Sequence, residues 1–98
     1  MPPGASMLIE VKCGSVDLSG VLESLARVDG VHAVFTVEDL EGRPWVLVMW
    51  RSLEEARSWA GGGGLDRLLG GCGYSYRLFR VTGHEHGPAH HGHHHGHH

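Results

Sequence analysis

The sequence predicts an α+β fold in which two helices cover one face of a four-stranded antiparallel sheet. Four β-rich runs and two helical patterns follow the order strand, helix, strand, strand, helix, strand. The two central runs, residues 31–38 and 45–50, flank a short polar link with Gly42 and Pro44, which indicates a hairpin. Right-handed crossovers then leave few alternatives to the split βαβ, or ferredoxin-like, arrangement (βαββαβ).

The first strand and the first helix follow from the spacing of apolar residues. Alternation over residues 7–13 predicts a strand with one buried side. Residues 19–28 carry apolar side chains at helical spacing, with Asp17 or Ser19 available as the cap. Gly30 is expected to end this helix in a left-handed conformation.

The second half of the domain begins with residues 45–50, which are apolar at six consecutive positions. Ser52 and Glu55 then form a capping box that predicts the start of the second helix. The glycine run 61–64 ends this helix, residues 65–69 can add one helical turn, and residues 74–81 form the last strand.

The strand at residues 45–50 has apolar residues on both of its faces, but helices cover only one face of the predicted sheet. We therefore expect a homodimer or larger homo-oligomer, assembled through the sheet face or its edge. The alternative is that Trp45 or Trp50 lies half-exposed under a loop.

Composition limits the function classes. A chain of 98 residues forms one domain, and we assign a disordered leader to residues 1–6, the domain to 7–82 and a His/Gly-rich flexible tail to 83–98. The formal charge of −3 and the scattered basic residues argue against a nucleic-acid partner. No membrane span or signal peptide is expected, so the expected location is cytoplasmic.

Cys13 and Cys72 are brought together by the predicted topology, because the first and last strands are antiparallel neighbours. The polar hairpin turn with Glu38, Asp39 and Glu41 lies at the same edge. The two cysteines could form a redox-sensitive disulfide or, as thiolates, a site for a soft metal. The general behaviour of cysteine as a small buried hydrophobe favours two unpaired residues instead.

The tail has the clearest chemistry in the sequence, because closely spaced imidazoles on a flexible backbone bind divalent Ni, Zn, Co or Cu. Nickel and zinc are expected first, if the tail is native. Interruptions at Gly92 and Gly96 favour a native tail over an engineered purification tag. The candidate metal ligands, with the two cysteines, are His84, His86, His90, His91, His93, His94, His95, His97 and His98.

His32 and Trp50 are the candidates for binding a small molecule. His32 shares its predicted strand face with Thr36 and Glu38, and a solvent-facing histidine is the commoner outcome for such a residue. No catalytic motif can be defended, so the sequence predicts a non-enzyme without assigned catalytic residues.

Residues 8–81 resemble the ligand-binding domain of the leucine-responsive (Lrp/AsnC-type) regulators, on the segments LIEVKCG, VLESLARVDGVHAVF and SLEEARSW. The resemblance implies sheet-mediated dimers and rings that bind small molecules between subunits. The chain has EDLEGRPWVLV where that family has a Gly-x-x-Asp step. It has no helix-turn-helix, so DNA binding is not implied.

Two further resemblances share this fold. Cys13-Gly14-Ser15-Val16, with Gly30-Val31 and Gly73-Tyr74, resembles the heavy-metal-associated domain, although Val16 replaces the second thiol of its metal loop. Residues 50–59 resemble the small dimeric α/β-barrel monooxygenases.

Three functions follow from these observations. The first is a metal-binding protein for buffering, sensing or delivery, in which the histidine tail holds the ion. The alternative is a stand-alone regulatory small-molecule-binding module, with the tail as a tag. The second alternative is a dimeric α/β-barrel enzyme of monooxygenase type, with the open sheet face as its pocket.

Overall fold

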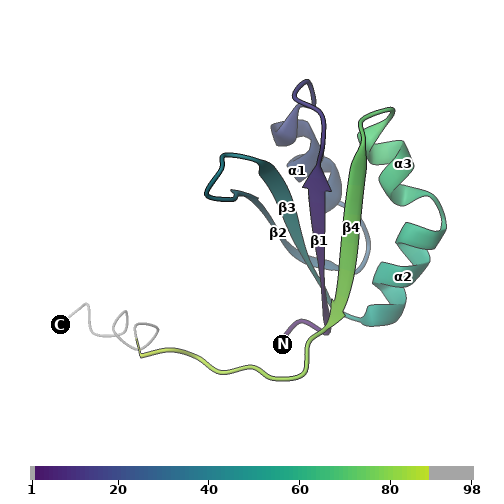
Figure 1. Cartoon of the computed structure of the whole chain (residues 1–98). Helices are drawn as coiled ribbons and strands as arrows, with labels where there is room; N and C mark the ends of the chain where they lie inside the picture. Colours follow the sequence, from purple (N-terminus) through teal and green to yellow (C-terminus); the bar gives the residue numbers. More distant parts are fainter. Residues whose placement is uncertain (1, 89–98) are drawn as a thin grey trace.

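The computed structural model describes residues 2–88 and confirms the ferredoxin-like fold. Figure 1 shows a four-stranded antiparallel sheet with the helices packed on one side. The strands are β1 (Ala5–Val11), β2 (Val31–Glu38), β3 (Pro44–Trp50) and β4 (Tyr74–Arg80), in the spatial order β2-β3-β1-β4. The helices are α1 (Leu18–Ala26), α2 (Leu53–Gly61) and α3 (Gly64–Leu69).

β1 begins inside the segment that the sequence assigned to a disordered leader. Ala5 is fully buried and pairs with Trp50 of β3 and with Arg80 of β4. Gly4 extends this pairing, since its N–H donates to the carbonyl oxygen of Trp50 at 2.8 Å. The alternation therefore starts at Ala5 and places every second residue of β1 in the core.

The helix boundaries follow the predicted caps with one difference. At α2, the Glu55 N–H donates to Ser52 Oγ at 3.1 Å, which is the N-cap hydrogen bond of the predicted capping box. The Ser52 hydroxyl also donates to Glu55 Oε1 at 3.0 Å, so the two side chains contact each other directly. Asp17 occupies the N-cap of α1 without a side-chain cap hydrogen bond. Gly30 follows α1 with φ of 93°, the left-handed conformation expected there.

The core lies between the helices and one face of the sheet. β1 and β3 supply its centre because both are interior strands, and α1, α2 and α3 cover them. Its buried members are Ala5, Met7, Ile9, Val11, Val21, Leu25, Val46, Val48, Trp50, Ala56, Leu65 and Leu69.

The other face of the sheet carries no helix and is rich in apolar side chains. Register places Phe35 beside Leu47 and Leu47 beside Leu8, across three strands. Phe35 and Phe79 remain 49% and 43% exposed, whereas Leu47 is half-buried by its neighbours. Within residues 2–88, no helix is long and apolar enough to cross a membrane.

Candidate functional site

Trp50 and Trp59 form an aromatic pair between the sheet and the helical layer. Trp50 ends β3 on the helix-covered face and is fully buried. Trp59 belongs to α2, is half-buried, and lies with its ring centroid 5.6 Å from that of Trp50 at an interplanar angle of 45°. The alternation of β3 places Trp50 inward, away from the open sheet face on which a ligand pocket was expected.

The indole nitrogen of Trp50 is buried and has no hydrogen-bond partner among the described residues. A buried donor without an acceptor costs about 1–3 kcal/mol. Burying an indole of roughly 200 Å² contributes about 5 kcal/mol at ~25 cal/mol per Å², so the residue still stabilises the fold. The result is a donor held in a dry environment, where a hydrogen bond to an incoming oxygen atom is strong.

Two hollows flank Trp59 on the surface of the helical layer, and both are also lined by Val28. One has a volume of about 370 Å³ and includes Asp29, Glu55 and Ser58. The other has a volume of about 310 Å³ and is completed by Ser24, Gly64, Arg67 and Leu68. Volumes of this order suit a small organic ligand.

Gly64 determines where the Trp59 ring can lie. It is the buried first residue of α3, and a Cβ there would overlap the Trp59 indole. The absence of a side chain lets the ring pack directly on the backbone at the start of α3. Arg67 holds the same segment, because its Nη1 donates to the carbonyl oxygen of Gly62 at 2.7 Å.

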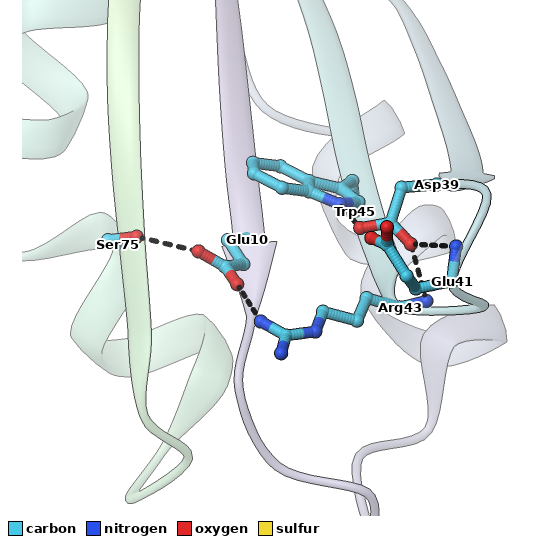
Figure 2. Close-up of polar contacts among 6 residues, drawn as sticks. All are labelled: Glu10, Asp39, Glu41, Arg43, Trp45 and Ser75. Carbon is cyan, nitrogen blue, oxygen red and sulfur yellow. Dashed lines mark hydrogen bonds and ion pairs between the residues drawn. The ribbon is translucent and has the colours of Figure 1, made fainter.

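A group of polar residues, separate from the aromatic pair, lies at the hairpin end of the open sheet face (Figure 2). Glu10 on β1 accepts from Arg43 Nη1 at 3.3 Å and from the Ser75 hydroxyl at 3.4 Å. Asp39 accepts from the Trp45 indole at 3.1 Å and from the Arg43 N–H at 2.9 Å. The backbone hydrogen bond from Arg43, followed by that from the Trp45 indole, lowers the pKa of Asp39 below its usual value.

The hairpin end also contains both cysteines, and they form a disulfide with a Cα–Cα distance of 5.5 Å. The predicted proximity of Cys13 and Cys72 is therefore confirmed. Their sulfurs are bonded to each other, so the interpretation as unpaired residues is wrong for this structure, and this state offers no thiolate to a metal. A hollow of about 690 Å³ lies beside Cys13 and includes Glu10, Lys12 and Arg43.

The other predicted site residues are dispersed. His32 is exposed on β2 at an irregularity in the pairing with β3, between Val31 and Ala33. His84 and His86 are exposed, with ring centroids 4.9 Å apart. Within residues 2–88, no three side chains of metal-binding type gather into a site. Seven predicted ligands lie outside the described residues: His90, His91, His93, His94, His95, His97 and His98.

Comparisons with solved structures match nearly the whole domain. A variant of SnoaB, a cofactor-independent oxygenase from Streptomyces nogalater, matches with a TM-score of 0.60 and 10% identity over 84% of this chain and 96% of that one. MhuD, a heme-degrader from Mycobacterium tuberculosis solved with two hemes in its active site, matches with a TM-score of 0.55 and 16% identity over 84% and 99%.

The ActVA-Orf6 monooxygenase of Streptomyces coelicolor, in complex with Nanaomycin D, has a TM-score of 0.57 and 14% identity over 87% and 93% of the two chains. No family model and no curated protein matches the sequence. The matches support a ferredoxin-like small domain. They do not single out the leucine-responsive regulators or the heavy-metal-associated domain among its relatives.

The first prediction concerns the packing of Trp59. Gly64→Ala should lower the free energy of unfolding by about 1–3 kcal/mol, because the new methyl group overlaps the indole. Gly61→Ala is the matched control, since a Cβ at the end of α2 meets open space. Urea unfolding and near-ultraviolet circular dichroism measure the two effects. Equal stabilities and unchanged tryptophan signals in both variants would contradict the packing described.

Proposed function

We propose that the chain is a small enzyme of the dimeric α/β-barrel monooxygenase type, which binds a planar aromatic molecule at Trp59. The observation that carries this proposal is Trp59, which lines two hollows and packs on Trp50, whose buried indole N–H has no partner among the described residues. The fold supports it, because the described structural matches include oxygenases and a heme-degrader. An enzyme therefore replaces a non-enzymatic metal-binding protein as the first function that we propose.

The residues around Trp59 suggest how such a ligand is held. An aromatic ring that displaces Trp59 can stack against its indole, a contact worth about 0.5–1.5 kcal/mol beyond burial. The ring would then approach the Trp50 N–H, which can donate to a carbonyl or phenolate oxygen of the ligand. A donor of this kind stabilises negative charge that develops on that oxygen during reaction.

The chemistry of the lining favours a metal-free aromatic ligand over heme. Neither hollow is lined by histidine, cysteine, methionine or tyrosine, the residue types that act as axial ligands to heme iron. Without a cofactor, the electrons that reduce O2 must come from the substrate itself. The substrate class that we propose is therefore an electron-rich, phenolic polycyclic molecule.

Ligand binding tests this proposal with two matched tryptophans. Nanaomycin D should bind the full chain, and Trp50→Phe should weaken binding at least about fivefold, the effect of losing roughly 1 kcal/mol of hydrogen bonding. Trp45→Phe also removes an indole N–H, but one that Asp39 already engages, and should bind normally. Isothermal calorimetry measures the affinity of each variant. No binding to the full chain, or a loss of affinity confined to Trp45→Phe, would contradict the proposal.

Oxygen uptake separates an enzyme from a regulatory binding module. A panel of phenolic polycyclic compounds should support O2 consumption that depends on the protein. Tight binding without oxygen uptake would favour the regulatory small-molecule-binding module, of the type found in leucine-responsive regulators, over the enzyme.

The open sheet face supports a homodimer, which is part of the same proposal. Phe35 lies on this face and is half-exposed, so Phe35→Asp places a charge within the proposed interface. We expect this variant to be monomeric by light scattering, with the unmodified chain dimeric. Arg57→Asp, on the exposed side of α2, should stay dimeric. An unmodified chain that is monomeric at high concentration would contradict the dimer.

Metal binding by the histidine tail is a second, independent prediction. The closeness of the His84 and His86 rings supports it, since two imidazoles already lie near each other. Calorimetric titration with nickel or zinc should show binding to the full chain and none to a chain ending at Gly83. Equal binding by both chains would overturn it. The cytoplasmic location also stays a prediction.

A further inference from the structure

The Cys13–Cys72 disulfide joins two loops at the hairpin end of the domain. Cys13 follows β1, and Cys72 lies between α3 and β4, 59 residues later in the chain. The bond is therefore located at the end of the β1–β4 pair, at the margin of the core, against which half-buried Cys72 packs.

Both sulfurs are close to space that a small molecule can enter. The two cysteines are half-buried and together line a hollow of about 370 Å³, whose wall includes Ser15, Gly70 and Gly71. Cys13 also lines the hollow of about 690 Å³ on the side of Lys12 and Arg43. A structural disulfide sealed in a core would offer no such approach.

The loops around the bond are held by other interactions as well. The Lys12 N–H donates to the carbonyl oxygen of Gly73 at 2.8 Å, and the Cys72 N–H donates to that of Leu69 at 3.0 Å. Tyr74 donates to Asp66 at 2.6 Å, a hydrogen bond that raises the pKa of Tyr74. These contacts and the β1–β4 ladder should keep the domain folded when the sulfurs separate.

The loop before β4 has the backbone freedom that opening the bond requires. Gly70 and Gly71 adopt positive φ values of 36° and 81°, and added Cβ atoms there would meet nothing within 4 Å. Glycine at both positions leaves the backbone before Cys72 sterically unhindered, so small rotations there can separate the sulfurs.

We propose that Cys13–Cys72 is a reversible thiol-exchange site that takes low-molecular-weight thiols, with Cys72 as the sulfur attacked. A thiolate RS⁻ bonds to Cys72 Sγ, the protein S–S bond breaks, and Cys13 leaves as a thiolate. A second RS⁻ attacks the mixed disulfide at the sulfur of the bound thiol, releasing RSSR and the Cys72 thiolate. With proton uptake by both cysteines, two RSH are oxidised and one protein disulfide is reduced.

Charge decides which cysteine leaves. Lys12 and Arg43 line the same hollow as Cys13, and since Glu10 pairs with Arg43 at 3.3 Å, Lys12 is the positive charge that favours a Cys13 thiolate. A more stable leaving thiolate departs faster, which directs attack to Cys72. The incoming thiol then occupies the hollow bounded by Ser15, Gly70 and Gly71.

Redox titration of the folded full chain tests the exchange. In excess reduced glutathione without denaturant, intact mass after alkylation should show both thiols free. Adding glutathione disulfide should restore the protein disulfide, with the far-ultraviolet circular dichroism unchanged throughout. A bond that resists reduction until denaturant is added, or a domain that unfolds on reduction, would show a structural staple and overturn the proposal.

Two variants test the direction of attack. Cys13→Ser exposed to glutathione disulfide should carry one stable glutathionyl group on Cys72, because no second thiol can displace it. Lys12→Gln should slow reduction of the native disulfide several-fold, whereas Arg57→Gln, exposed on α2, should leave the rate unchanged. An unchanged rate in Lys12→Gln would contradict Cys13 as the leaving thiolate.

Discussion

The packing of Trp59 over Trp50 is the contact on which the helical layer depends. Trp50 is the last residue of β3 and is fully buried, and Ser52, two residues later, caps α2. Trp59 returns from α2 to cover Trp50, and Gly64 lets α3 start directly against that ring. One aromatic pair thus connects the end of β3, α2 and α3. Trp59 also lines two hollows, and the Trp50 indole N–H has no partner among the described residues.

The architecture could be predicted because its signals are local. Alternation in β1, the capping box at Ser52 and the glycine after α1 each act within a few residues, and each is present in the structure. The start of β1 was placed two residues late, because Ala5 carries little hydrophobic signal and its burial arises from pairing with Trp50 and Arg80. Asp17 or Ser19 was expected to cap α1; Asp17 occupies the N-cap, but its side chain makes no cap hydrogen bond.

The candidate site was harder to predict because it depends on contacts between distant segments. Trp50 was predicted to bind a ligand. The face of the sheet on which its side chain lies could be determined only from the register of β3. Nothing in the sequence around Trp59 shows that Gly64 supports its ring. The proximity of Cys13 and Cys72 could be predicted since it follows from topology alone. Whether their sulfurs bond could not, because that depends on loop geometry.

The most direct measurement is a ¹H–¹⁵N spectrum that resolves the three indole N–H groups of the full chain, with and without Nanaomycin D. In the free protein, the Trp50 indole proton should be protected from solvent exchange. On ligand addition it should shift downfield as it gains an acceptor, while the Trp45 signal stays in place because Asp39 already accepts from it. A shift confined to Trp45, or no shift at Trp50 and Trp59, would contradict a ligand site at the aromatic pair.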